Sequence, residues 1–189
     1  MNRVWIVDLD NTVAHTTRDM QDDQNRYTSL TLVDGIREFL EETKVRGDRR
    51  VLVTVGEWAL QERKIQHLGL TFDQAHILPP EQDDLFAEIE AYLLGQEAQV
   101  LTSIKQPVLK KFADEYPDAS KIVVGDRLDR DIAVGKSLGF ITVRVRLPEG
   151  KYSDWEPSCE EEVPDHTVKD FFELMQLPFF SQPIPPASP

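Results

Sequence analysis

Short apolar runs alternate with amphipathic stretches along this chain. Four runs rich in valine and isoleucine are bounded by polar or turn residues, and they predict buried strands over residues 4–7, 51–55, 122–124 and 141–145. A further strand is expected near residues 75–78. Because strands that alternate with helices form right-handed βαβ units, the pattern predicts an α/β fold. We expect a three-layer α/β/α sandwich with a mainly parallel, Rossmann-like sheet.

The stretches between the strands carry apolar residues at helical spacing. Leu60, Ile65 and Leu68, for example, mark the expected buried face of one helix, which ends near Gly69. Helices are therefore expected around residues 36–40, 60–68, 85–93, 108–112, 132–138 and 171–175.

Two segments break this alternation. Residues 148–166 are acidic and contain prolines, which predicts a long loop. Residues 178–189 hold five prolines, which predicts a disordered tail. The chain is therefore expected to form one domain over residues 1–177.

The composition fits a folded domain and limits its partners. The chain has 189 residues, of which 40% are hydrophobic, and its net charge of −13 opposes non-specific binding to nucleic acid or to an anionic membrane. Cys159 is the single cysteine, so a disulfide framework within the chain is excluded. No apolar run reaches the ~18 residues of a membrane span, and the first residues lack a signal-peptide core. A cytoplasmic location is expected.

Side chains that can carry chemistry follow the predicted strands or precede a helix. Parallel strands place their carboxyl ends at one edge of a sheet, so these side chains are expected to meet there. Carboxylates can bind Mg²⁺, attack phosphorus and transfer protons, while a hydroxyl and a lysine can hold phosphoryl oxygens. The candidates are Asp8, Asp10, Thr54, Lys105, Asp126 and Asp131.

This ordered set resembles the haloacid dehalogenase superfamily of phosphohydrolases. The family pattern is Asp-x-Asp-x-Thr, then a strand that ends in Thr or Ser, then Lys, then Gly-Asp-x-x-x-x-Asp. Here the four motifs read DLDNT at 8–12, VLVT at 51–54, Lys105 and GDRLDRD at 125–131. The resemblance covers residues 3–145 and implies the fold of that superfamily.

The resemblance also implies a role for each candidate. Asp8 is expected to be the nucleophile and Asp10 the general acid and base. The hydroxyl of Thr54 and the ammonium group of Lys105 are expected to hold the phosphoryl group. Mg²⁺ is expected to bind Asp8, the backbone carbonyl of Asp10 and Asp126, with Asp131 in support.

Two of these assignments have neighbours that compete with them. Lys110 or Lys111 could replace Lys105 if the helix begins elsewhere, but Pro107, which suits a first helical turn, favours Lys105. Asp129 could replace Asp131, or could cap the next helix instead.

The lengths between motifs predict a member of the family without a cap domain. Residues 13–30 are the candidate for a partial lid, with His15, Arg18, Arg26 and Tyr27 as contacts, or else a mobile polar loop. An open site implies a bulky substrate or a lid from a second subunit, so a homo-oligomer is possible.

The leading hypothesis is a Mg²⁺-dependent phosphatase that forms an aspartyl-phosphate intermediate on a phosphorylated substrate of unknown identity. A phosphatase for phosphoproteins or nucleic-acid ends, a phosphotransferase, and a non-catalytic phosphate-binding scaffold are the alternatives. A phosphoacceptor signalling domain would also carry acids at strand ends but would gain nothing from Asp10 as a proton donor.

Overall fold

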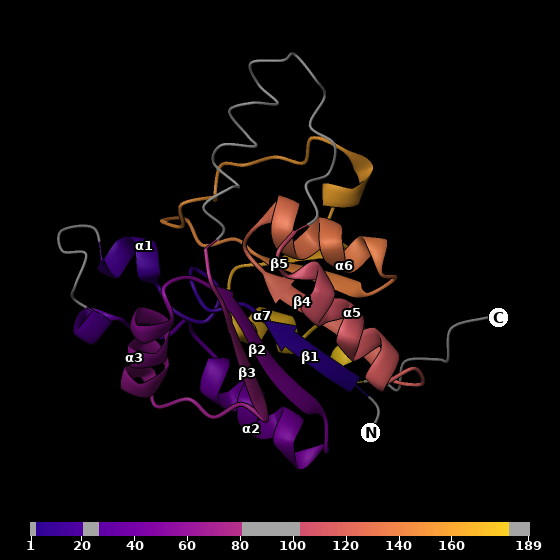
Figure 1. Cartoon of the computed structure of the whole chain (residues 1–189), viewed down its shortest axis with the longest axis horizontal. Helices are drawn as coiled ribbons and strands as arrows, with labels where there is room; N and C mark the ends of the chain where they lie inside the picture. The colour runs from indigo at the N-terminus through magenta and orange to yellow at the C-terminus, as the bar shows by residue number, and fades with distance from the viewer. Residues whose placement is uncertain (1–2, 21–26, 81–102, 182–189) are drawn as a thin grey trace.

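A six-stranded sheet forms the centre of the molecule in the computed structural model, which describes residues 3–20, 27–80 and 103–181. Every strand pairs in parallel with its neighbours, in the order β3-β2-β1-β4-β5-β6 (Figure 1). The predicted α/β fold with a parallel sheet is therefore confirmed. The strands are β1 (Arg3–Val7), β2 (Arg49–Val55), β3 (Gln74–Leu78), β4 (Ser120–Gly125), β5 (Ile141–Val145) and β6 (His166–Val168).

Helices connect most of the strands. The predicted helix at 85–93 lies outside the described residues, and the predicted helix at 132–138 begins as a π-helical turn, η2. The helical elements are α1 (Thr16–Asp19), η1 (Tyr27–Ser29), α2 (Ile36–Val45), α3 (Trp58–Leu68), α5 (Gln106–Glu115), η2 (Leu128–Ile132), α6 (Ala133–Ser137), η3 (Glu160–Glu162), α7 (Phe171–Met175) and α8 (Pro178–Ser181). No helix among these described elements is long and apolar enough to cross a membrane.

The two faces of the sheet carry separate apolar clusters, because successive side chains of a strand point to opposite faces. The larger cluster packs Trp5 and Val7 against α2, α7 and α8, where the rings of Trp5 and Phe39 meet edge to face at 5.0 Å. The smaller cluster packs Val4 and Ile6 against α5 and α6. The helices therefore form the two outer layers of the predicted sandwich.

The register of the central strands sets the position of the site. Val7, the last residue of β1, pairs with Leu52 of β2 on one side and with Val124 of β4 on the other. The residues that follow these strands consequently emerge side by side at the carboxyl edge of the sheet.

Helix α3 turns a different face to the core from the predicted one. Leu60 and Ile65 are only partly buried, whereas Gln61 is 2% exposed and Lys64 is 4% exposed, beside the buried Leu68. Two polar side chains therefore replace apolar ones on the inner face of this helix. The reason lies in the carboxylate of Asp10, described below.

The predicted tail begins too early at residue 178. Residues 178–181 form α8, and the ring of Phe180 is buried under the guanidinium group of Arg46, 4.0 Å from the ring centroid. Arg3 also donates a hydrogen bond to the carbonyl oxygen of Phe180 at 3.1 Å. The apolar surface of Phe180 outweighs the proline content here, and residues 182–189 lie outside the described residues.

The long loop after β5 is confirmed, with one addition. It contains the short helix η3 and ends in β6, a three-residue strand at the edge of the sheet. The segments where a cap could be inserted are only partly described, so the capless architecture stays a prediction.

Candidate active site

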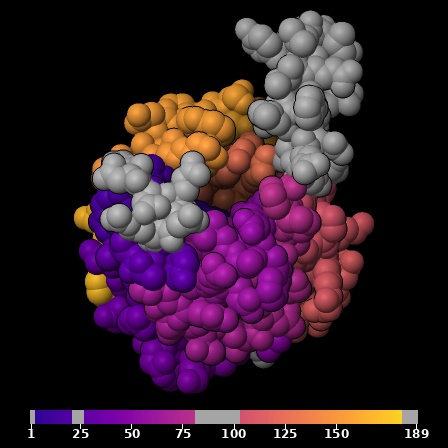
Figure 2. Space-filling model, turned by 60° about the vertical axis from the view of Figure 1, so that its left-hand side comes forward, coloured from indigo at the N-terminus to yellow at the C-terminus, as the bar shows by residue number. Residues whose placement is uncertain are grey.

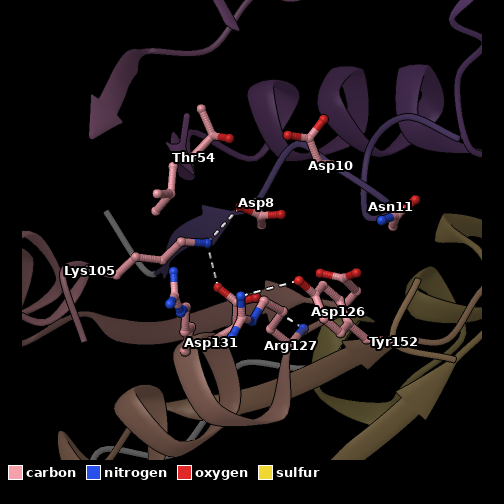
Figure 3. Close-up of a pocket in the computed structure, with 11 residues that line it drawn as sticks. Asp8, Asp10, Asn11, Thr54, Lys105, Asp126, Arg127, Asp131 and Tyr152 are labelled. Atoms are coloured by element: carbon pink, nitrogen blue, oxygen red, sulfur yellow. Dashed lines mark hydrogen bonds and ion pairs between the residues drawn. The ribbon is translucent and has the colours of Figure 1, made fainter. Parts of the chain in front are cut away.

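A pocket of about 170 Å³ opens at the carboxyl edge of the sheet. In Figure 2 the surface is hollowed between the orange part of the chain and the purple part that includes α3. All six candidate residues from the sequence line this pocket, and Figure 3 shows how they face one another. The lining consists of Asp8, Asp10, Asn11, Thr54, Val55, Lys105, Asp126, Arg127, Arg130, Asp131 and Tyr152.

The turn after β1 brings two carboxylates to the pocket. The carbonyl oxygen of Leu9 accepts hydrogen bonds from the backbone N–H groups of Val13 and Ala14, at 2.9 and 3.1 Å. Asn11 has φ of 55°, the left-handed conformation that asparagine adopts more readily than most residues. This tight turn keeps Asp8 and Asp10 on the same side of the strand end.

Lys105 joins the first motif to the last. Its Nζ atom lies 2.6 Å from Oδ1 of Asp8 and 2.6 Å from Oδ1 of Asp131, and the residue is 4% exposed. Burial opposes the charge of Lys105, but Asp131 and Asp8 outweigh it and raise its pKa. Lys110 is exposed and Lys111 pairs with Glu115. Lys105 is therefore the lysine at the pocket.

Asp131, rather than Asp129, is the second acid that Lys105 contacts. Asp131 is 2% exposed, and its Oδ2 accepts a hydrogen bond from the backbone N–H of Arg127 at 3.2 Å. A Cβ atom on Gly125 would lie 2.3 Å from the Asp131 carboxylate, so only glycine fits there. Asp129 instead forms an ion pair with Arg127.

Asp8 and Asp126 are acids in an unfavourable electrostatic setting. Burial raises the pKa of Asp8 to about 7; Lys105 opposes this shift, whereas Asp131 and Asp10 add to it. Burial, together with Asp8 and Asp131, also raises the pKa of Asp126 well above its usual range. The Oδ2 atom of Asp126 is buried without a hydrogen-bond partner among the described residues.

These properties fit a divalent cation. Carboxylate oxygens of Asp8, Asp126 and Asp131 lie within 4.8 Å of one another. Both carboxylate oxygens of Asp131 already accept hydrogen bonds, from Lys105 and from the backbone N–H of Arg127. Asp8 and Asp126 are therefore the acids that can supply oxygen ligands. Oxygen donors that retain room for water suit Mg²⁺. A cation there would compensate the buried negative charge.

Asp10 has a separate set of partners that the sequence did not reveal. Its Oδ1 lies 2.7 Å from Nζ of Lys64 and accepts a hydrogen bond from the Thr16 hydroxyl at 2.7 Å. Its Oδ2 accepts a hydrogen bond from Gln61 Nε2 at 2.8 Å, and the same amide donates to the Thr54 hydroxyl at 3.1 Å. The i, i+3 spacing of Gln61 and Lys64 on one helix face was the only available signal.

Arg127, which follows β4, and Tyr152, in the loop after β5, line the pocket side by side. The guanidinium group of Arg127 lies 4.7 Å from the ring centroid of Tyr152 and donates a hydrogen bond to its hydroxyl at 3.3 Å. The Asp129 carboxylate holds the other side of this guanidinium group. Tyr152 was not a candidate from the sequence, whereas the position of Arg127 beside Asp126 made it a residue that could contact substrate.

The segment predicted as a partial lid is described in part. His15 Nδ1 lies 2.9 Å from Oε1 of Glu149, and Arg18 reaches the same atom at 3.4 Å. The ring of Tyr27 packs against His67, and Arg26 lies outside the described residues. His15 and Arg18 therefore tie the segment after β1 to the loop after β5.

Part of the sequence is similar to known phosphatases. No protein-family model matches the chain. It is 43% identical over 56 residues to the glyceraldehyde 3-phosphate phosphatases of Methanopyrus kandleri and Methanocaldococcus jannaschii. The match to each covers 30% of this chain and only 23% and 22% of those relatives.

The solved structures show the fold over nearly the whole chain. The D,D-heptose 1,7-bisphosphate phosphatase of B. bronchiseptica, complexed with magnesium and phosphate, aligns with a TM-score of 0.60 at 16% identity, over 93% of this chain and 99% of its own. The 2-haloacid dehalogenase of Pseudomonas syringae aligns with a TM-score of 0.56 at 16% identity, over 93% and 97%. The fold that the four motifs imply is thus confirmed, since this chain shares the fold of these two enzymes.

Proposed function

We propose that this chain is a Mg²⁺-dependent phosphatase that hydrolyses a phosphate monoester through an aspartyl phosphate on Asp8. The observation that carries the proposal is Lys105, whose Nζ lies 2.6 Å from both Asp8 and Asp131 in a pocket that also holds Asp10 and Asp126. The partial match to glyceraldehyde 3-phosphate phosphatases supports phosphate-ester chemistry. It spans too little of those proteins to assign their substrate to this chain.

In the first half-reaction, a carboxylate oxygen of Asp8 attacks phosphorus while the bond from phosphorus to the leaving oxygen breaks. Asp10 gives its proton to that oxygen, so an alcohol leaves. Lys105 neutralises charge on the phosphoryl oxygens. The Thr54 hydroxyl accepts from Gln61, which leaves its own O–H to donate to a phosphoryl oxygen.

In the second half-reaction, water attacks the phosphorus of the aspartyl phosphate. Asp10, now ionised, accepts a proton from that water, and the bond to the Asp8 carboxylate breaks. Inorganic phosphate leaves, and both aspartates return to their starting states. One carboxyl group therefore serves as acid and then as base.

Asp8 and Asp126 would hold Mg²⁺, together with the backbone carbonyl of Asp10 that the motif implies. The bound ion would supply positive charge that allows an anionic carboxylate to approach an anionic phosphate.

The test is hydrolysis of p-nitrophenyl phosphate by the full chain, with Mg²⁺ and with excess EDTA. We expect turnover that needs the metal and falls to background in Asp8→Asn, because the amide removes the attacking charge and keeps the shape. Asp73→Asn is the matched control, since Asp73 pairs with Arg50 at the opposite edge of the sheet. Equal turnover by Asp8→Asn would exclude Asp8 as nucleophile, and a wild-type chain without turnover would favour the phosphate-binding scaffold.

A further inference from the structure

Helix α3 holds the carboxylate of Asp10 from outside the four motifs. Lys64 approaches Oδ1 at 2.7 Å, and Gln61 donates to Oδ2 at 2.8 Å. The Thr16 hydroxyl also donates to Oδ1. Because both oxygens are engaged, any rotation of the carboxylate breaks at least one of these contacts.

The burial of the two α3 side chains is costly unless they have partners. Gln61 is 2% exposed and Lys64 is 4% exposed, whereas the Asp10 side chain keeps 27% of its surface exposed. Lysine is almost never fully buried unless it is paired, and an unpaired buried amide is also unfavourable. The arrangement therefore depends on the Asp10 carboxylate as the common acceptor.

The amide of Gln61 is fixed from several sides. Besides Asp10, the Thr54 hydroxyl at 3.1 Å and the carbonyl oxygen of Val55 at 3.0 Å lie within hydrogen-bond distance of its Nε2, so three acceptors share the two N–H groups of this amide. A Cβ atom on Gly56 would lie 2.7 Å from this Nε2, so the glycine leaves the space that the amide occupies. Gln61 thus connects the end of β2 to the turn after β1.

We infer that Lys64 and Gln61 are positioning residues that hold the Asp10 carboxylate in place for proton transfer to the leaving oxygen. This inference rests on the proposed function. An ionised carboxylate offers about four acceptor positions, and Lys64, Thr16 and Gln61 occupy three of them. The remaining position is on Oδ2, where Asp10 can carry the proton that moves to the leaving oxygen as the phosphorus–oxygen bond breaks.

The test compares two esters that differ in their need for that proton. p-Nitrophenolate leaves readily without protonation, whereas the alkoxide of glycerol 2-phosphate does not. We expect Lys64→Met to lower kcat/KM on glycerol 2-phosphate by roughly 10- to 100-fold, part of the ~10²–10⁴-fold typical of acid–base catalysis, and to lower it on p-nitrophenyl phosphate by less than about threefold. A fall of equal size on both esters would overturn the inference.

Two further variants sharpen the result. Lys136→Met is the matched control, because it removes a lysine that pairs with Asp165 away from the pocket, and it should change neither ester. Gln61→Leu should show the same dependence on the leaving group as Lys64→Met. Because both side chains hold one carboxylate, the double variant should lose less than the product of the two single losses. Fully multiplicative losses would contradict a shared role.

A structural measurement separates this inference from the proposed function. In crystals of Lys64→Met, we expect the Asp10 carboxylate to leave its wild-type orientation or to occupy several. An unchanged carboxylate would overturn the positioning role. If the wild-type chain hydrolyses neither ester, the proposed function fails, while the orientation of Asp10 in this variant still decides whether Lys64 positions it.

Discussion

Both ends of the sheet bring aspartates and basic side chains together, but the ratio of acid to base differs. At the amino end, each acid has its own arginine: Asp48 lies 3.7 Å from Arg3, and Asp73 lies 2.7 Å from Arg50. At the carboxyl end, Lys64 pairs with Asp10 and Arg127 with Asp129, but Asp8, Asp126 and Asp131 share Lys105 among them. The pairs at the amino end are balanced by the chain itself, whereas the cluster of three acids around Lys105 is not.

The directions of the pKa shifts follow this ratio. Burial alone would raise the pKa of Asp73, but its hydrogen bonds from Arg50 outweigh burial and lower it. At the carboxyl end, burial and neighbouring acids raise the pKa of Asp8 and Asp126 despite Lys105. The Asp73 pair at the amino end therefore contributes to folding stability. The acids at the carboxyl end retain negative charge that a ligand can compensate.

Lys105→Met should lower the stability of the carboxyl end most, because it removes the one cation among three buried acids. We expect the free energy of unfolding to fall by about 3 kcal/mol, the lower end of the range for breaking a buried pair, since the pocket admits water. Urea unfolding measures it. Lys111→Met, which breaks an exposed pair with Glu115, is the control and should cost less than ~0.5 kcal/mol. Equal losses in the two variants would refute the special status of Lys105.

The pH dependence of stability should differ between the two ends. For Asp8 the folded pKa is raised, so its contribution is present below about pH 4, the usual carboxyl pKa, and is lost as the pH rises through about 7. For Asp73 the folded pKa is lowered, so its contribution is present above that usual value and is lost as the pH falls through the folded pKa. Without metal, the free energy of unfolding of the wild-type chain should fall between pH 4 and 7. Asp8→Asn should remove part of this fall, roughly 2 kcal/mol. The measurement is the urea midpoint of each protein across this pH range, in EDTA. Wild-type and variant midpoints that change equally with pH would contradict this role of Asp8.

Asp73→Asn should have the smallest effect and should act on stability alone. Loss of the charged hydrogen bonds from Arg50 should cost about 1 kcal/mol, because this pair is partly open to solvent. Hydrolysis of p-nitrophenyl phosphate should stay at the wild-type rate, since Asp73 lies at the far end of the sheet. A loss of turnover without a loss of stability would show that the two ends are coupled.

The sequence predicted the parallel sheet and the six candidate residues because both depend on simple geometry. Short apolar runs rich in valine and isoleucine favour buried strands, and residues that follow parallel strands share one edge of the sheet. Lys105 was separable from its neighbours by Pro107, which marks the first turn of α5.

The missed features depend on three-dimensional contacts that periodicity does not encode. Gln61 and Lys64 resemble solvent-facing residues of α3 until the turn after β1 places Asp10 beside them. Strand β6 has only three residues, of which His166 and Thr167 are polar, so no apolar run marks it. The prolines around Phe180 predicted a disordered tail, although the Phe180 ring packs under Arg46.

The strand order limits how far the chain can be shortened. β1 occupies the middle of the sheet, and its second neighbour, β4, begins at Ser120. Any amino-terminal fragment that stops earlier leaves the backbone N–H and C=O groups along one edge of β1 unpaired, which is a template for aggregation. The same fragment ends before Asp126 and Asp131, so Lys105 lacks one of its two partners there. Assembly of the site therefore requires that the central strands β1, β2 and β4 have paired.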